Sequence, residues 1–428
     1  MTRRRSGRVL VALLGAAACA RSVVPSSPTI PLAEPSRIET SVYLIGDGGK
    51  PKAAGEPVLI ALSRALAGDP ARSFVIFLGD NIYPRGLDAG PPSDAPEDQK
   101  RKLAAQLTPV VERGVRGIVV PGNHDWARHS PSGWASIQAQ ERFVRDTVAA
   151  LERALNVRRQ DGEPTVELLP KRGCPGPSVK DVGDHLRVVV LDTQWWLHPF
   201  DRPNAKFCGE QADTRTVERI REALAGAGER RTLVVAHHPF ESAGEHGGYF
   251  DLQNHLFPLT AAGSQWYLWV PLPLLGSLYP LARMHGVDPQ DLSNGFNCRM
   301  RAVFDSAFRP IPPLLYAAGH DHGLQVFKSR PARYEAVSGG GIYGHTDAIG
   351  RHRNSLYSAA LSGFMRLDVM RDGSPPRLGV HIVDKKGGDR EVFSTLLDDT
   401  TPAAPLEPRV CRDGPRAPDL SVQAPGRQ

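Results

Sequence analysis

Short apolar runs alternate with amphipathic segments along the middle of the chain. The runs are four to six residues long, which is the length of a buried strand, and six of them stand out: 42–45, 74–78, 117–120, 186–191, 232–236 and 314–318. Between them, apolar positions recur at helical spacing over 57–66, 98–113, 134–155, 214–225 and 297–308. Strands that alternate with helices predict an α/β fold in which helices cover a sheet.

The two ends of the chain lack this pattern. Residues 1–20 combine an arginine-rich start, a short apolar run and small residues around Cys19, which is typical of a signal peptide or a lipoprotein signal. We expect an exported protein, periplasmic or an outer-membrane lipoprotein and possibly secreted, with either lipidation at Cys19 or cleavage nearby. Residues 21–39 are rich in proline and serine and predict a linker, the folded domain is expected over 40–395, and an irregular tail over 396–428.

One stretch within the domain, at about 250–295, has an unusual composition. Residues 256–283 combine tryptophan, tyrosine and many leucines with prolines at 258, 271, 273 and 280. The prolines argue against a membrane-spanning helix. Two interpretations remain: an insertion packed on the domain, or a functional segment that serves as a hydrophobic lid, a membrane-surface contact or a partner contact.

Composition and charge narrow the class of protein. The chain has 428 residues, 41% of them hydrophobic and 23% charged, which suits one large globular domain or two modest ones. The formal charge of +6 is spread along the chain without a basic block, so we expect no nucleic-acid binding.

The cysteines, like the predicted signal segment, indicate an oxidising compartment outside the cytoplasm. Without Cys19 they number four, so an oxidising compartment would allow up to two disulfides, and the spacing does not choose among the three pairings of Cys174, Cys208, Cys298 and Cys411. No CxxC pair supports a zinc site.

Side chains that bind cations follow five of the six apolar runs directly. They are Asp47 after the first, Asp80 and Tyr83 after the second, Asn123, His124 and Asp125 after the third, His237 and His238 after the fifth, and His320, Asp321 and His322 after the sixth. Each has an ordinary explanation on its own, such as a turn or a buried imidazole. Because ligands collect at the carboxyl ends of strands in α/β sheets, we expect these side chains to converge. Carboxylates, an amide, a phenol and imidazoles together suit iron, zinc or manganese better than calcium.

These blocks resemble the calcineurin-like metallophosphoesterases. The similarity is carried by Gly-Asp47-Gly-Gly, Gly-Asp80-Asn-Ile-Tyr83, Gly-Asn123-His124-Asp125, Val-Ala-His237-His238-Pro and Gly-His320-Asp-His322-Gly. Glycine two residues after Asp47, where most of the superfamily has histidine, and a tyrosine at 83 are closest to the purple acid phosphatases of the tartrate-resistant type. The similarity extends over about 42–347 and includes Val337-Ser-Gly-Gly-Gly341, which resembles that family's closing strand and loop.

The resemblance implies a four-layer α/β/β/α sandwich with a dinuclear metal site at the strand C-terminal ends. It implies Fe(III) bound by Asp47, Tyr83 and His322, and a divalent iron, zinc or manganese bound by Asn123, His237 and His320. Asp80 would bridge the two ions. His124 would protonate the leaving group, Asp125 would orient His124, and His246 would lie near the substrate, whereas His238 would be a neighbour of the ligands.

The expected activity is hydrolysis of small phosphomonoesters by in-line attack of a metal-bound hydroxide. Two alternatives stay open. The same site could act on phosphodiesters or nucleotides, because surrounding loops select the substrate. The chain could also be a non-catalytic, lipid-anchored binding protein of the cell envelope that keeps the fold as a scaffold and uses the hydrophobic insertion for contact. Membrane association is possible through a lipidated Cys19 or through 256–283.

Overall fold

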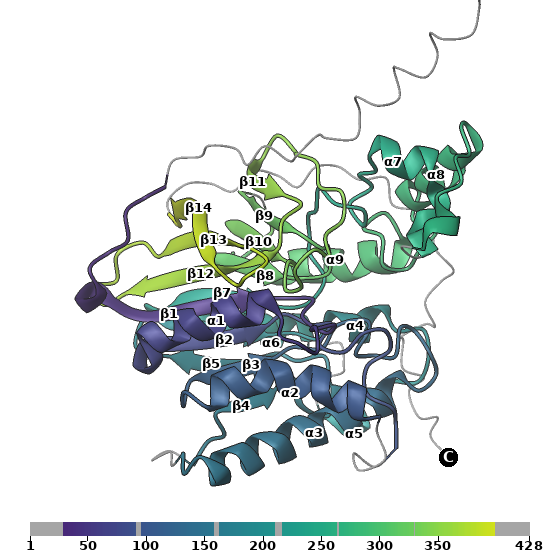
Figure 1. Ribbon diagram of the computed structural model, residues 1–428. Coiled ribbons are helices and arrows are strands. Elements are labelled where there is room, and N and C mark those ends of the chain that lie inside the picture. Colours follow the sequence, from purple (N-terminus) through teal and green to yellow (C-terminus); the bar gives the residue numbers. More distant parts are fainter. Residues whose placement is uncertain are drawn as a thin grey trace, which may run out of the picture.

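The computed structural model describes residues 29–90, 96–157, 162–209, 216–262, 265–328 and 330–398 (Figure 1). The predicted signal segment with Cys19 and nearly all of the predicted tail, including Cys411, lie outside the described residues. The expectations for cleavage, lipidation and an irregular tail therefore stay predictions.

Two seven-stranded sheets form the centre of the fold. The first has the order β14-β13-β12-β1-β2-β3-β4 and the second the order β11-β9-β10-β8-β7-β6-β5. The strands of the first are β1 (Ile38–Ile45), β2 (Ser73–Phe77), β3 (Arg116–Val119), β4 (Val166–Leu168), β12 (Gly363–Met370), β13 (Arg377–Val383) and β14 (Asp389–Leu396). Those of the second are β5 (Ser178–Val182), β6 (Leu186–Val190), β7 (Arg231–Val235), β8 (Leu315–Ala318), β9 (Leu324–Phe327), β10 (Tyr334–Ser338) and β11 (Ser355–Ala359).

The strands that carry the candidate site are parallel within each sheet. β1, β2, β3 and β4 run parallel, as do β6, β7, β8 and β10, whereas β12–β14 extend the first sheet in antiparallel pairs. The two sheets meet at their carboxyl ends, where Gly46 N donates to Ser338 O over 2.7 Å. This junction brings the loops after both parallel sets to one end of the molecule.

Side-chain alternation along the strands separates three apolar layers. Val42 and Leu44 of β1 face the second sheet and join its residues in a core between the sheets, whereas Tyr43 and Ile45 face the helices α1, α2 and α3. On the outer face of the second sheet, strands β6–β8 pack on α6 and α9. The helices are α1 (Pro57–Gly68), α2 (Glu97–Val111), α3 (Gly133–Ala154), α4 (Thr193–Leu197), α5 (Ala205–Cys208), α6 (Thr216–Ala225), α7 (Leu252–Leu256), α8 (Leu278–Met284) and α9 (Gly295–Phe308). The order helix, sheet, sheet, helix confirms the predicted four-layer α/β sandwich.

The predicted insertion forms a separate helical lobe. Helices α7 and α8 and the short 3-10 turns between them project from the sheets in Figure 1. Among the described residues, no helix is both long enough and apolar enough to cross a membrane.

Covalent and polar contacts attach two outlying segments to the domain. Cys174 forms a disulfide with Cys208, which is one of the pairings that the cysteine count allows and fits an oxidising compartment. A second bridge to Cys411 would involve a residue outside the described part. Within the predicted linker, Ile30 N donates to Ser394 Oγ over 2.6 Å, so the chain contacts the first sheet before β1 begins.

Candidate metal centre

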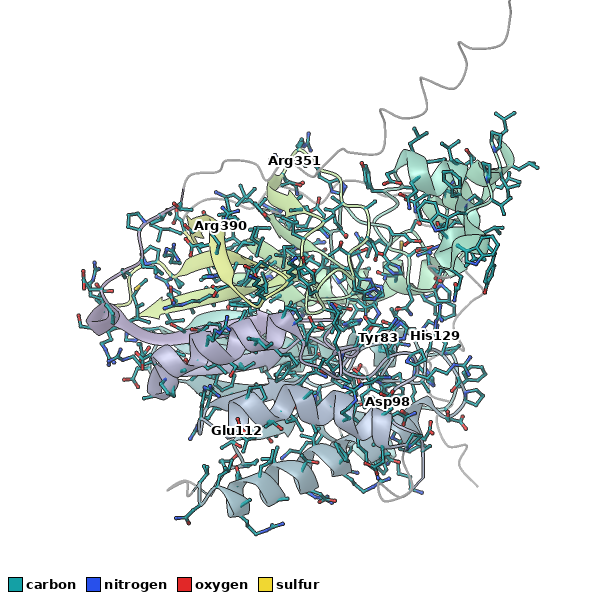
Figure 2. All side chains as sticks on the ribbon, viewed as in Figure 1. Tyr83, Asp98, Glu112, His129, Arg351 and Arg390 are labelled. Carbon is teal, nitrogen blue, oxygen red and sulfur yellow. A yellow bond between two sulfur atoms is a disulfide. The ribbon has the colours of Figure 1, made fainter. Side chains whose placement is uncertain are left out.

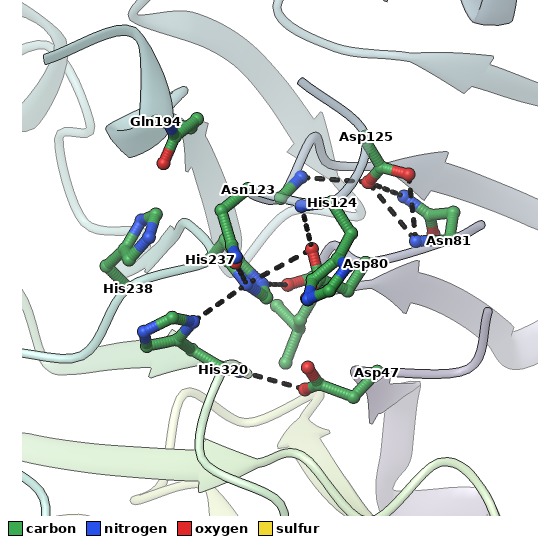
Figure 3. Close-up of polar contacts among 12 residues, drawn as sticks. Asp47, Asp80, Asn81, Asn123, His124, Asp125, Gln194, His237, His238 and His320 are labelled. Atoms are coloured by element: carbon green, nitrogen blue, oxygen red, sulfur yellow. Dashed lines mark hydrogen bonds and ion pairs between the residues drawn. The ribbon is translucent and has the colours of Figure 1, made fainter. Parts of the chain in front are cut away.

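The side chains that follow strands β1, β2, β3, β7 and β8 converge at one end of the two sheets (Figure 3). His237 Nε2 lies 2.9 Å from Asn123 Oδ1, 3.2 Å from His320 Nδ1 and 3.4 Å from Asp80 Oδ1. These four residues come from both sheets and are buried. They form the group for which we expected a divalent ion, with Asp80 on its edge.

A second group adjoins the first through the two aspartates. Tyr83 Oη donates to Asp47 Oδ1 over 3.0 Å and lies 3.1 Å from His322 Nε2, which is 3.7 Å from the same carboxylate oxygen. Figure 2 labels Tyr83 at this end of the sheets. Asp47, Asp80 and His237 offer ligand atoms that all lie within 4.8 Å of one another. All seven predicted ligands therefore meet in one place.

Unusual backbone angles direct several of these side chains. Asp47, Asp80 and His320 have φ angles of 60°, 55° and 76°, in the left-handed region that non-glycine residues rarely adopt. A left-handed residue shortly after the end of a strand turns the chain sharply at the edge of the sheet. His320 N then donates to Asp47 Oδ2 over 2.8 Å, which ties the two loops together.

Glycines make the close approach of these loops possible. Gly79 has φ 96°, and a Cβ there would lie 2.5 Å from His237 Nδ1. A Cβ at Gly122 would overlap the carboxylate and backbone nitrogen of Asp80. The glycines that precede Asp80 and Asn123 are therefore required by packing at the site.

The hydrogen-bonding pattern of His237 fits a cation between its neighbours. His237 Nδ1 lies 2.8 Å from Leu78 O, an acceptor, so this nitrogen carries the proton of the neutral ring. Nε2 of the neutral ring then directs a lone pair at Asn123 Oδ1, which is also an acceptor. Such opposed lone pairs are stable only when a proton or a metal ion lies among them. His320 Nε2 is buried without a hydrogen-bond partner among the described residues.

The electrostatics among these side chains also fit a cation site. Burial lowers the pKa of both His237 and His322, but Asp80 acts against this on His237 and raises its pKa to about 9, while Asp347 raises that of His322 to about 10. Burial raises the pKa of Asp47 to about 6, and the charge on His237 holds the pKa of Asp80 below its usual value despite burial. Protonated imidazoles thus balance buried carboxylates where metal cations would do so.

The phenol of Tyr83 keeps its proton beside these buried carboxylates. Burial and then the charges of Asp47 and Asp80 raise the pKa of the phenol well above its usual value. A phenolate at this position would need a strongly charged cation beside it.

His238 is engaged on both ring nitrogens. Its Nδ1 lies 2.8 Å from Thr193 Oγ1 and its Nε2 lies 2.5 Å from Gln290 Oε1. Although His238 lies near His237 and His320, these contacts favour the neighbour role that we expected.

His124 lies beside the ligands, but Asp125 does not orient it as predicted. His124 N donates to Asp80 Oδ1 over 2.8 Å, its ring packs 4.4 Å from the Tyr83 ring, and its Nδ1 lies 2.7 Å from Pro84 O. Asp125 instead accepts from the backbone nitrogens of Asn81, Ile82 and Gly122. The prediction that Asp125 orients His124 is wrong, because its carboxylate turns back to hold the loop that presents Asp80.

His246 reaches the site from the edge of the insertion. Its ring stacks on His320 with centroids 4.0 Å apart, and its Nδ1 lies 3.2 Å from Arg283 Nη2 and 3.4 Å from Asp291 Oδ1. Burial lowers the pKa of His246, but the carboxylate of Asp291 outweighs this and raises it. The predicted position near the substrate is consistent with this geometry.

Several residues of this network were not predicted. Asp347 Oδ2 lies 2.8 Å from His322 Nδ1, so it fixes the ring from the side opposite Tyr83. Gln290, Arg283 and Asp291 come from the insertion, where the sequence shows no strand end that would mark them. The one signal for Asp347 was its position at the end of the region of resemblance.

Comparisons with known proteins give a likeness of fold at low identity. No family model and no curated protein matches the chain. Among solved structures, the chain is similar to "GAP50 the anchor in the inner membrane complex of Plasmodium", with 14% identity and a TM-score of 0.48 over 89% of this chain and 98% of that chain. It is similar to purple acid phosphatase PPD1 from yellow lupin seeds, with 15% identity and a TM-score of 0.45 over 83% of this chain and 53% of that chain. It is also similar to PhoD, with 10% identity and a TM-score of 0.44 over 89% of this chain and 74% of that chain. The chain thus spans about half of the lupin protein, and the case for the site rests on its own geometry.

Proposed function

We propose that the chain is a metal-dependent phosphatase of the metallophosphoesterase class that hydrolyses small phosphomonoesters at a dinuclear centre. Asp47, Tyr83 and His322 would hold Fe(III), and Asn123, His237 and His320 would hold a divalent iron, zinc or manganese ion. Asp80 lies between the groups and would bridge them. When bound, the two cations supply Lewis-acid chemistry and make a water molecule nucleophilic near neutral pH.

One observation carries this proposal. Seven side chains with oxygen or nitrogen ligand atoms follow strands of two different sheets, and these atoms meet in one place at hydrogen-bond distances. A structural polar network would pair donors with acceptors throughout. Here His320 Nε2 is buried without a hydrogen-bond partner among the described residues, and His237 Nε2 faces the acceptor Asn123 Oδ1, as expected where a cation binds.

Neighbouring side chains would handle the substrate. His124 sits beside Asp80 with its Nε2 3.8 Å from Asp80 Oδ2, where it could donate a proton to the departing alkoxide. His246, stacked on His320, would contact the phosphoryl group from the opposite side. We further propose that the protein acts after export, in the periplasm, on the outer membrane or outside the cell, where the Cys174–Cys208 disulfide is stable.

The test combines metal analysis with activity on two ester classes. Purified protein should contain about two metal ions per chain, as expected for a two-metal site, should absorb in the visible if iron faces Tyr83, and should hydrolyse an aryl phosphate monoester faster than the matching diester or a nucleotide. Asp80→Ala should lose both metals and all turnover, because the shared anionic ligand is gone. Asp146→Ala, at an exposed position on α3, serves as the matched control and should keep both.

Two results would overturn the proposal. Fully metal-loaded protein that turns over none of these esters would favour a binding role. Faster hydrolysis of the diester or nucleotide than of the monoester would transfer the activity to the phosphodiesterase or nucleotidase class.

A further inference from the structure

The helical lobe exposes a set of large apolar side chains to solvent. We call it the docking face and define it as Trp266, Tyr267, Trp269, Leu274, Leu275 and Leu278. Trp266 is 85% exposed and Leu274 is 90% exposed, and the other four are exposed as well. Figure 1 shows that this lobe projects away from the sheets. The apolar side chains therefore contribute little to the core, and their exposure needs another explanation.

The docking face is free of charge along an unusually long stretch. From Leu252 to Ala282 the sequence contains no Asp, Glu, Lys or Arg. Arg283, which ends this stretch, turns inward to Asp291 and Glu245 over 2.7 and 2.8 Å. A protein interface normally has a polar rim with charged pairs, and a second copy would bring the same uncharged surface.

The chemistry of the face matches the interface of a phospholipid bilayer. Tryptophan and tyrosine favour the headgroup level, because their rings are apolar and carry a polar N–H or O–H group. Leucines favour the acyl boundary below it. The C-terminal tail matches the docking face less well than a bilayer does, since residues 399–428 are rich in proline and charged residues.

The backbone conformation at Leu274 is unusual, and the side chain is exposed. Leu274 has φ 70°, a left-handed angle that is rare for leucine, and it lies between Pro273 and the 3-10 turn that starts at Leu275. The strained tip is fixed from within the lobe: Leu272 N donates to Leu256 O over 2.8 Å, and Gly276 N donates to Leu272 O over 2.6 Å. These hydrogen bonds within the lobe thus fix the backbone conformation that exposes Leu274.

We propose that the docking face inserts into the headgroup and acyl boundary of a phospholipid bilayer. The face stands beside the candidate centre, because α8 carries Leu278 on its outer side and Arg283, which contacts His246, on its inner side. The lobe would therefore hold the site at the membrane surface. This inference does not depend on the proposed activity.

The test measures vesicle binding of the full chain with Cys19→Ala, which removes any lipid anchor. The probe is vesicles of phosphatidylcholine alone. Replacing Trp266, Trp269, Leu274 and Leu278 together by serine should weaken partitioning at least about tenfold, because the inserted apolar surface is lost. A matched control replaces Leu155, Val179 and Leu396, which are 45%, 40% and 43% exposed elsewhere, and should bind as the parent does. Because the parent and both variants carry Cys19→Ala and the same residues 1–28, any vesicle binding by those residues is equal in all three proteins.

Two further measurements make the result specific. Since the face is uncharged, binding should change little between about 0.1 and 0.5 M salt and with added anionic lipid. Amide exchange over 266–278 should slow further when vesicles are added, beyond the protection that the hydrogen bonds of the lobe already give. The proposal is overturned if the fourfold variant partitions like the parent. It is also overturned if vesicles leave the exchange of these amides unchanged, or if a rise in protein concentration without lipid slows it as vesicles do, which would point to a second copy.

Discussion

Single residues at the strand ends carry strain that the fold does not need for its core. Asp47, Asp80 and His320 adopt left-handed angles, and each costs on the order of 1–3 kcal/mol of stability. Such strain persists where several contacts hold it, and here the three residues contact one another or the ligands beside them. It is consistent with a site whose geometry is fixed before any ion binds.

Gly122→Ala should damage the centre without unfolding the protein. The new Cβ would overlap Asp80, so we expect the divalent site to lose metal affinity by at least about tenfold, the scale of disrupted support around a ligand. Gly68→Ala at the end of α1 is the control, since a Cβ there meets nothing within 4 Å. Metal titration of both variants checks this. Equal affinities would show that the 122 loop does not shape the site.

His124→Ala should separate chemistry from metal binding. We expect full metal content and a kcat lower by about 100-fold or more, the scale usual for a proton donor. Metal analysis and steady-state kinetics on an aryl phosphate measure both quantities. An unchanged kcat would remove His124 from the mechanism.

For single residues, the sequence predicted which side chains converge at the site better than it predicted the contacts that each of them makes there. The seven ligands could be found because each follows, directly or within one turn, an apolar run whose carboxyl end lies at a known edge. The role of Asp125 could not, because adjacency to His124 suggests a pair, whereas the turn at Gly122 sends the two side chains to different partners. Asp347 lies in a loop without periodicity, so nothing local marked its contact with His322.

Among the elements, the parallel strands β1, β2, β3, β6, β7 and β8 and the longer helices were predicted to within a few residues, whereas β4 and the antiparallel strands were missed. Strand β12 contains Arg366 and the fully buried Asp368, which accepts from Ser41 Oγ over 2.7 Å. A buried ion pair interrupts the apolar pattern that identifies strands such as β2. Strand β13 is similarly broken by Gly379 and His381. These strands are specified by partners far away in the sequence.

Helix α8 should fix His246 through Arg283. Replacing this buried arginine by methionine leaves Asp291 without its partner, and we expect a loss of about 3–5 kcal/mol of stability within the lobe. Turnover should fall while metal content stays, because His246 loses its support. Arg309→Met, whose arginine is 74% exposed in its pair with Asp305, should change stability by under about 1 kcal/mol. Amide exchange over 278–291 with kinetics tests this, and faster exchange with full activity would limit Arg283 to a structural role.

Strand β10 should give the stability of the protein a dependence on pH. Burial, and then the charge of Glu241, raise the pKa of Glu335 to about 8, while its Oε1 accepts from Phe240 N and Glu241 N. A carboxyl whose pKa is raised by folding keeps its proton only in the folded chain. Its destabilising effect is therefore absent below the unfolded pKa and grows as pH rises toward about 8.

Glu335→Gln keeps the acceptor and removes the titration. We expect the variant to gain about 1 kcal/mol or more over the parent at pH 8 relative to pH 5, since one pKa unit corresponds to about 1.4 kcal/mol. Urea unfolding at both pH values measures the difference. Parallel pH profiles would contradict it.

The molecule as a whole combines two sheets, one candidate centre and one projecting lobe. The sheets are held by the apolar layer between them, and the parallel strands of both deliver their ends to the same place. The sequence contained this arrangement in its order of strands and motifs. It did not contain the orientation of the lobe, which depends on side-chain contacts such as that of Arg283 with His246.

Anomalous diffraction from crystals grown with iron and a divalent metal tests the central claim most directly. We expect two separate anomalous peaks on either side of Asp80, one against Asp47, Tyr83 and His322 and the other against Asn123, His237 and His320. Well-diffracting crystals without a peak among these seven side chains, or with ions bound only elsewhere, would contradict it.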